Sequence, residues 1–580
     1  MSPQSRRTAL GAALIAAAAL GLYGATVGFD FVFDDHVQIE RNPWLRDPDG
    51  LRLFFTQPFW GFYHDRGAGP SNYYRPLFGV FYSLLARAFG LQAMAFHAAS
   101  VLLHAAVCLL VALGARRLVR DDAAAGDPVA ALGAGLFFAI YPVHAEAVAW
   151  VGGQADLLAA LFVLLATLAY LSGIQNPKSK IQNLSGPLCY LLACLAKETG
   201  AALILVLFAV EASEWRREGS PGAALRRGAA RLAPYALVLA VYLALRVNAL
   251  GGFAPRHYGV TASPAGAVAF AGALLARYLG FLLAPLAPQV LVSVPNPGLL
   301  SLGALAGLFA GGLALAGLAA AVWNGRARRE VVLPLAFLFA FLLPVLASNS
   351  IGGAHFAERY LYLPSVGLAW LAGLLWSRVA RALPAGTARR AVTAFAIVDL
   401  LVLGAVAWER STIYRNDLAL FTEAARGNPG NEIARNNLGM ALYHEGRLDE
   451  AEREYREALR LRPGSVAPLS NLAILYERRG QVAKARAAFE ETLRRSPTHA
   501  AAAVHLARFR LAEGDTAGAA RSLDALFAAG GESYDALVER ADLWLREGRP
   551  EKAVPLLERA VAAFPDRRKG REMLERARGG

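Results

Sequence analysis

The chain has 580 residues, of which 56% are hydrophobic, and its mean hydropathy of +0.36 excludes an ordinary soluble protein of this size. The formal net charge is +14. Because Arg and Lys gather in short connections between apolar runs, they indicate membrane topology, and we expect no nucleic-acid partner. The three cysteines, Cys108, Cys189 and Cys194, lie in apolar segments and predict no disulfide framework.

Apolar runs of spanning or near-spanning length fill the first 410 residues. The first run follows Arg6 and Arg7, and it is long enough to be a retained membrane anchor rather than a cleaved signal peptide. Basic clusters lie between alternate runs and predict a cytoplasmic N-terminus and, for an odd number of crossings, an extracytoplasmic C-terminus. The length rule predicts about eleven spans, near 9–27, 93–119, 128–144, 156–173, 186–197, 199–213, 231–250, 302–323, 331–348, 358–376 and 391–409.

Three further regions differ from ordinary spans. The stretches 51–62 and 74–90 carry Arg among aromatic residues and predict interfacial helices, and region 253–301 is interpreted in the same way. The pair 186–197 and 199–213 is too short for two full spans. Short helices that meet at a polar break often mark a binding site.

The C-terminal part repeats every 34 residues, which is the period of tetratricopeptide (TPR) helix pairs. The period is visible in a Pro that ends each unit, a Gly between the two helices and an Ala at their contact. We therefore predict a membrane domain over 1–410, a half-repeat joining segment over 411–430, and a TPR domain of four repeats plus a capping helix over 431–580. The repeated residues are Pro429, Pro463, Pro497 and Pro565; Gly446, Gly480, Gly514 and Gly548; and Ala451, Ala485, Ala519 and Ala553.

Charged residues near membrane depth are costly and are therefore candidates for function. Asp34 and Asp35 follow the first span in an aromatic stretch, where paired carboxylates can act as a general base or hold a divalent cation. A solvated loop start is the alternative. His144, Glu146 and Asp156 lie at the outer ends of the third and fourth spans, and they either orient an acceptor or base or serve as helix caps and interfacial polar groups.

Several cations are predicted on the same outer side. Lys197 stands at the break between the two short helices and suits a phosphate, with Glu198 fixing its position; a structural Lys197–Glu198 ion pair is the alternative. His355 and Arg359 are candidate phosphate donors, Glu358 is expected to pair with Arg359, and Arg75 adds another cation. The combination of carboxylates with several basic side chains on one side of the membrane predicts a site for an anionic, lipid-linked donor whose reaction needs a base.

These motifs, in this order, resemble the transmembrane-and-TPR (TMTC-type) O-mannosyltransferases of the GT-C glycosyltransferase superfamily. The shared motifs are the acidic pair, Tyr-Arg-Pro-Leu, Pro-Val-His-Ala-Glu-Ala, Lys-Glu-Thr-Gly and Glu-Arg-Tyr-Leu-Tyr-Leu-Pro-Ser. The resemblance implies an all-α fold, in which a polytopic GT-C-type helix bundle precedes a TPR α-solenoid. It also implies a polyprenyl-phosphate sugar donor on the outer side, catalysis by Asp34 or Asp35, and donor-phosphate binding by Lys197 and Arg359.

The expected partners are the lipid-linked donor, membrane lipid and a protein or peptide acceptor in the TPR groove. Mg or Mn at Asp34 and Asp35 is the candidate cofactor. The residue composition suggests a bacterial inner membrane with periplasmic repeats, and an ER lumen is the alternative. Two other functions stay open: a non-catalytic scaffold derived from such an enzyme, and a lipid-linked oligosaccharide ligase or polymerase.

Overall fold

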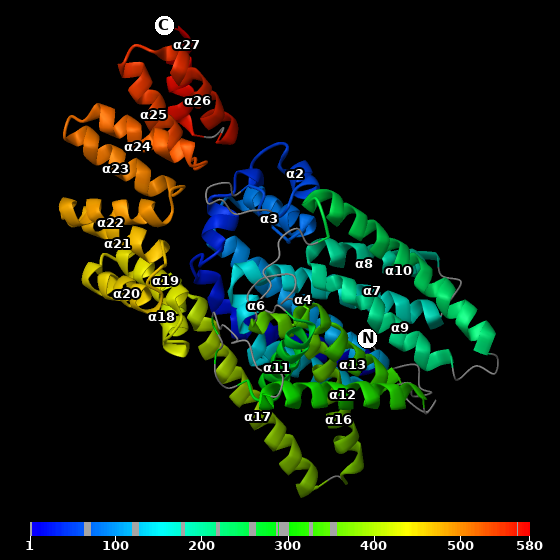
Figure 1. Cartoon of the computed structure of the whole chain (residues 1–580). Helices are drawn as coiled ribbons and strands as arrows, with labels where there is room; N and C mark the ends of the chain where they lie inside the picture. Colours follow the sequence, from blue (N-terminus) through cyan, green and yellow to red (C-terminus); the bar gives the residue numbers. More distant parts are fainter. Residues whose placement is uncertain are drawn as a thin grey trace. The chain divides into compact units, whose positions relative to one another are not determined.

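The computed structural model describes residues 3–62, 71–118, 127–175, 180–215, 221–253, 263–285, 288, 290, 301–323, 329–347, 356–384, 386–564 and 567–579. Within these ranges every regular element is a helix, which confirms the predicted all-α fold. The chain forms two compact units, a first that ends at Leu420 and a second that begins at Phe421 (Figure 1).

The first unit consists mainly of long apolar helices. Seven helical segments in the described part of the chain are long and apolar enough to cross a membrane, or eight if a bent pair counts as one span. The predicted number of eleven spans stays a prediction. The helices are α1 (Pro3–Tyr23), α2 (Gly50–Thr56), α3 (Pro76–Phe89), α4 (Ala93–Leu118), α5 (Pro128–Ile140), α6 (Ala145–Ala149), α7 (Gln154–Gln175), α8 (Lys180–Ala196), α9 (Leu203–Trp215), α10 (Pro221–Leu250), α11 (Pro264–Leu283), α12 (Leu302–Trp323), α13 (Arg329–Ala340), α14 (Leu343–Leu346), α16 (Pro364–Ala382) and α17 (Thr387–Ser411).

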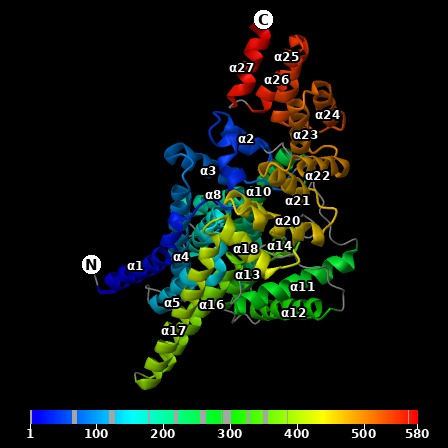
Figure 2. The ribbon, with the colours of Figure 1, turned by 90° about the vertical axis from the view of Figure 1, so that its left-hand side faces the viewer.

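One expectation about region 253–301 is wrong. Its middle part forms α11, a helix of 20 residues that is apolar enough to span, and α11 packs alongside α12 (Figure 2). The expected break between 186–197 and 199–213 is present, because α8 ends at Ala196 and α9 begins at Leu203 after a 3₁₀ turn, η6 (Glu198–Ala202).

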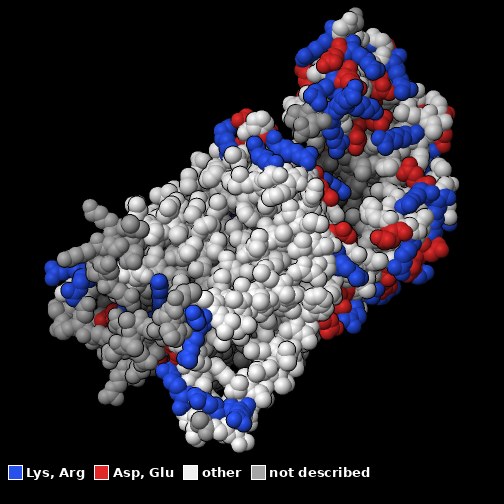
Figure 3. All heavy atoms as spheres, turned by 180° about the vertical axis from the view of Figure 1, so that it is seen from behind, with Lys and Arg blue, Asp and Glu red and all other residues white. Residues whose placement is uncertain are grey.

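Small residues bring the membrane helices close together. Gly373 on α16 packs against the backbone of α5 at Ala130, so a Cβ at this position would overlap the Ala130 carbonyl oxygen. Close backbone approach of this kind is typical of membrane helices, whose association depends on packing rather than on the hydrophobic effect. On the face of the bundle that Figure 3 shows, a broad area is free of described charged side chains.

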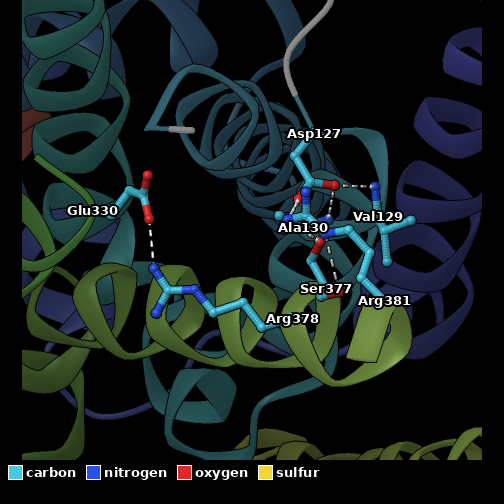
Figure 4. A network of polar contacts seen from close by, with 7 residues as sticks. All are labelled: Asp127, Val129, Ala130, Glu330, Ser377, Arg378 and Arg381. Carbon is cyan, nitrogen blue, oxygen red and sulfur yellow. Dashed lines mark hydrogen bonds and ion pairs between the residues drawn. The ribbon is translucent and has the colours of Figure 1, made fainter. Parts of the chain in front are cut away.

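Polar contacts connect α5, α13 and α16 (Figure 4). Asp127 caps α5 by accepting hydrogen bonds from the backbone amides of Val129 and Ala130, at 3.0 and 3.1 Å. The same carboxylate bonds to Ser377 and, at 2.7 Å, to Arg381 on α16. Beside it, Glu330 of α13 pairs with Arg378 of α16. These contacts join three helices at one end of the bundle.

The second unit is a stack of helix pairs and confirms the predicted TPR array (Figure 1). Gly446, Gly480, Gly514 and Gly548 have φ of 76°, 70°, 80° and 70° at the turn within each pair, a left-handed conformation that favours glycine. The four repeated Ala residues are completely buried. The helices are α18 (Asp417–Gly427), which enters the unit, α19 (Glu432–His444), α20 (Leu448–Leu461), α21 (Ala467–Arg478), α22 (Val482–Arg495), α23 (Ala500–Ala512), α24 (Thr516–Ala528), α25 (Tyr534–Arg546), α26 (Pro550–Ala563) and α27 (Arg568–Gly579).

Candidate functional site

The acidic pair lies in a tight turn after the first membrane helix. α1 continues as a 3₁₀ turn, η1 (Gly24–Gly28), and the chain then reaches Phe33 with a φ of 54°. Among the described residues, Phe33 is the one non-glycine residue with a positive φ. Such a conformation is strained for a bulky side chain, and strain of this kind concentrates at functional sites. The turn leaves Asp34 partly exposed and Asp35 buried.

The two carboxyl groups have different electrostatic environments. Burial raises the pKa of Asp34 to about 6, although the positive charge of Arg359 lowers it in part. Burial also raises the pKa of Asp35 well above its usual range, and the neighbouring Asp34 charge raises it further. One Asp35 oxygen accepts a hydrogen bond from the Val32 amide at 3.2 Å, whereas the other has no partner. At neutral pH Asp34 is therefore mostly a carboxylate, and its pKa of about 6 lies close to the range in which a general base works best.

Asp417, the first residue of α18, holds this turn in place. Its carboxylate accepts hydrogen bonds from the Phe33 amide at 2.8 Å and from the His36 Nε2 atom at 3.1 Å. The other ring nitrogen of His36 bonds to Glu40 at 2.7 Å. The hydrogen bond to Asp417, together with that to Glu40, raises the pKa of His36 to about 9, so the imidazole is charged at neutral pH.

Three predicted cations each bind a carboxylate from another part of the chain. Lys197 Nζ lies 2.6 Å from Asp156 Oδ1, and both side chains are buried. Arg75 donates from Nε to Glu198 Oε2 at 2.9 Å. The alternative interpretation, a structural ion pair between Lys197 and Glu198, is therefore wrong.

The third cation, Arg359, binds Glu146 through both its guanidinium and its backbone amide, the latter at 2.9 Å. The predicted Glu358–Arg359 pair is also wrong, because Glu358 binds Arg410. Both errors have the same cause. Residues that are adjacent in the chain point in different directions where the backbone forms a 3₁₀ turn. Lys197 is the extended residue just before η6, which begins at Glu198, and Glu358 and Arg359 are the first two residues of η7 (Glu358–Leu361).

Aromatic rings connect these cations into one cluster. The Tyr360 ring centroid is 4.9 Å from both Lys197 Nζ and Arg359 Cζ. Arg359 also lies over Trp150 at 5.0 Å, and Lys197 is within electrostatic range of Arg75 and Arg359. Because Asp34 is within electrostatic range of Arg359, the structure brings the acidic turn and the three cations together. Cation–π contacts of this kind fix the positions of charged groups.

The structure places two other predicted residues away from this cluster. His144 is fully buried and bonds to the Phe138 carbonyl oxygen and to Ser365, each at 2.8 Å, in an aromatic network within the bundle. Glu358 is buried against Arg410. His355 lies outside the described residues.

No group of three or more His, Cys, Asp or Glu side chains that could hold a metal ion occurs in the described part of the chain. Asp34 and Asp35 thus offer at most two carboxylates. That number fits Mg²⁺, which proteins often bind through one or two carboxylates while substrate phosphates complete the shell.

Sequence reasoning missed two residues of this region. Asp417 is the first residue of α18, and an acidic residue at the start of a helix is usually explained by its favourable interaction with the helix N-terminus. Its contact with the acidic turn is seen only in the folded structure. Arg246 is a single charge within the apolar helix α10, and this position was the available signal. Arg246 donates to the Asn72 carbonyl oxygen at 2.7 Å and acts electrostatically on Glu198.

The apolar helices and the repeats define a multi-pass membrane protein with a C-terminal TPR array. Two family models described as "Tetratricopeptide repeat" match residues 431–498 and 510–576. Over about three quarters of its length, the chain is similar to proteins named O-mannosyl-transferases. It is 25% identical over 460 residues to "Protein O-mannosyl-transferase F38B6.6" of Caenorhabditis elegans, covering 75% of this chain and 60% of that protein.

Two further proteins named O-mannosyl-transferases are similar to the chain over a comparable length. "Protein O-mannosyl-transferase TMTC4" of Mus musculus is 28% identical over 483 residues, covering 74% of this chain and 63% of that protein. "Protein O-mannosyl-transferase Tmtc3" of Drosophila melanogaster is 26% identical over 523 residues, covering 78% of this chain and 54% of that protein. The chain thus spans between 54% and 63% of the length of these three curated relatives.

Proposed function

We propose that this protein is a membrane glycosyltransferase that moves one sugar from a polyprenyl-phosphate donor to a hydroxyl of a protein or glycan acceptor. The sugar that we propose is mannose. The names of the relatives support the sugar and the reaction class. The observation that carries the proposal is the Asp34 carboxylate, whose pKa burial raises to about 6, within electrostatic range of the Arg359 guanidinium. A base with a pKa near the working pH and a cation for a phosphate are the two groups that this reaction needs.

In the proposed step, the acceptor hydroxyl oxygen forms a bond to the anomeric carbon while the bond from that carbon to the phosphate oxygen breaks. The acceptor proton passes to Asp34, and the electron pair of the broken bond stays on the polyprenyl phosphate. Arg359, Lys197 and Arg75 donate hydrogen bonds that stabilise the growing phosphate charge. A Mg or Mn ion, when bound at Asp34 and Asp35, would supply further positive charge to the phosphate.

The orientation of the chain is part of the same proposal. The site and the repeats lie on the extracytoplasmic side, in the periplasm of a bacterial inner membrane, as the basic connections on the other side predict. The TPR array presents a protein or peptide acceptor, since TPR units stack into extended concave surfaces that bind such partners.

The decisive experiment is a transfer assay with the full chain in nanodiscs, using polyprenyl-phosphate mannose as the donor. Asp34→Asn should lower the turnover roughly 10²–10⁴-fold, and Asp127→Asn, at the end of α5 away from the acidic turn, is the control for insertion and folding. Full activity of Asp34→Asn would exclude Asp34 as the base. A wild-type protein that binds a TPR partner but transfers no sugar would indicate a scaffold. Transfer only to glycan or lipid acceptors would indicate a ligase or polymerase.

A further inference from the structure

One of the buried Lys and Arg side chains, Arg246, differs from the others in having no carboxylate partner among the described residues. The structure describes five of them, and four form an ion pair with a carboxylate: Lys197 with Asp156, Arg329 with Glu214, Arg410 with Glu358 and Arg540 with Asp524. Arg246 is the exception, since no described carboxylate lies in ion-pair contact with it.

The Arg246 guanidinium is only partly satisfied. Its side chain is 6% exposed, and Nη2 donates to the Asn72 carbonyl oxygen at 2.7 Å. Nη1 is buried with no hydrogen-bond partner, as is one nitrogen of each of Arg329, Arg410 and Arg540, but those three residues also have a carboxylate partner. An Arg side chain stays charged under all ordinary conditions. Because an unpaired buried charge is strongly unfavourable, the arrangement indicates a site that an anion completes.

The surroundings of Arg246 favour a phosphate. Tyr242 lies one turn earlier on α10, and its buried hydroxyl interacts with the Arg246 guanidinium through poor hydrogen-bond geometry and has no other hydrogen-bond partner among the described residues. Glu198 is within electrostatic range, but it is already bound by Arg75. Arg75, Lys197 and Arg359 are each paired with a carboxylate, whereas Arg246, within electrostatic range of Glu198, has no carboxylate partner among the described residues.

The position on α10 also favours a lipid. Arg246 and Tyr242 face inward, whereas Leu237, Val241 and Leu245 on the same helix are 66%, 44% and 38% exposed. An apolar outer face beside a buried cation can hold an alkyl chain in the bilayer while its phosphate reaches the interior. We propose that Arg246 and Tyr242 bind the phosphate of a polyprenyl phosphate, an inference that deepens the proposed function and rests on it.

The test is binding of undecaprenyl phosphate to the full chain in phosphatidylcholine nanodiscs, with inorganic phosphate as a second ligand and phosphatidylglycerol as a competitor. Arg246→Gln should weaken binding of undecaprenyl phosphate roughly 10-fold or more, and Arg246→Lys should weaken it less because the charge survives. Without ligand, Arg246→Gln should melt no lower than the wild type, because it removes an unpaired charge. Undecaprenyl phosphate should raise the melting temperature of the wild type and not that of Arg246→Gln.

Arg329→Gln is the matched control, because Arg329 is equally buried but bound to Glu214. This variant should melt lower than the wild type and keep its affinity. Unchanged affinity in Arg246→Gln, equal loss in Arg329→Gln, or equally tight binding of inorganic phosphate or phosphatidylglycerol would overturn the inference. Binding through Arg246 without sugar transfer would refute only the proposed function. Transfer with an unchanged donor KM in Arg246→Gln would refute only this inference.

Discussion

His36 and Asp417 are separated by 381 positions in the sequence, yet His36 Nε2 lies 3.1 Å from Asp417 Oδ2. The second oxygen of Asp417 accepts the amide hydrogen of Phe33 at 2.8 Å. One carboxylate therefore holds both ends of the strained turn that carries Asp34 and Asp35. Through these contacts the start of α18 sets the direction of the proposed base, which makes Asp417 a positioning residue.

We expect Asp417→Ala to lower the turnover roughly 10- to 100-fold, because small errors in the placement of a reacting group are costly. The donor KM should change little, since Asp417 touches no proposed donor group. Asp417→Asn should retain more activity, because an amide oxygen can still accept from Phe33. Glu423→Ala on the same helix is the control, since Glu423 only pairs with the exposed Arg426. Equal turnover in Asp417→Ala and Glu423→Ala would contradict the positioning role.

The pKa of Asp34 predicts a pH dependence of the rate. As the pH rises through about 6, Asp34 loses its proton and becomes able to act as a base, so kcat/KM should increase across this range. The folded pKa lies above the usual value of 3.8, so the charged form is the less favourable one in the folded protein. Asp34→Asn should therefore melt at a higher temperature than the wild type above pH 6, although it is inactive. A wild-type rate that is constant between pH 5 and pH 8 would contradict this assignment.

The pKa of His36 predicts a loss of stability with rising pH, at a higher pH than for Asp34. Its folded pKa of about 9 lies above the ordinary 6.5, so the contact with Asp417 stabilises the protein fully below pH 6.5. This stabilisation is lost as the pH rises through about 9. The difference in melting temperature between wild type and His36→Gln should thus be largest below pH 6.5 and should shrink by pH 9.5. A difference that stays constant over this range would show that the charge on His36 contributes nothing.

Much of the fold was predictable because it follows from periodicity. The 34-residue repeat locates the turn glycines, and the structure gives each of the four a positive φ. The apolar runs predict the membrane helices, but α11 was missed as a candidate span because Arg277 and the surrounding loops obscure its apolar length. Hydropathy alone does not separate a short span from an interfacial helix.

The site was predictable in its residue types and not in its pairing. The sequence alone indicates that the acidic residues, Arg359 and the basic residue at the break between α8 and α9 are functional candidates, because charged side chains at membrane depth are costly. The partners of Lys197 and Arg359 come from other helices, Asp156 on α7 and Glu146 on α6, and sequence adjacency pointed instead to Glu198 and Glu358. Pairings of this kind depend on how helices pack, which a single sequence does not encode locally.

The orientation of the chain can be tested by cysteine labelling. With Cys108, Cys189 and Cys194 replaced, a probe at Gly514, in a turn of the TPR array, should react with an impermeant reagent added outside the cell. A probe at Gly386, which is exposed just before α17, should react only after the membrane is opened. The basic residues around Gly386 predict a position on the cytoplasmic side. Labelling of Gly386 alone in intact cells would invert the proposed topology.

The Lys197–Asp156 pair allows structural and functional roles to be separated. Both side chains are buried, and one Asp156 oxygen has no other partner, so Lys197→Gln leaves a buried charge uncompensated. That change should destabilise the protein by about 3–5 kcal/mol. The double variant Lys197→Gln with Asp156→Asn replaces two charges by two neutral amides and should recover most of this loss. Undecaprenyl phosphate affinity is then measured on the stable double variant. A role for Lys197 in donor binding predicts weaker binding by roughly 10-fold, whereas wild-type affinity would show that the pair only joins α7 to the end of α8.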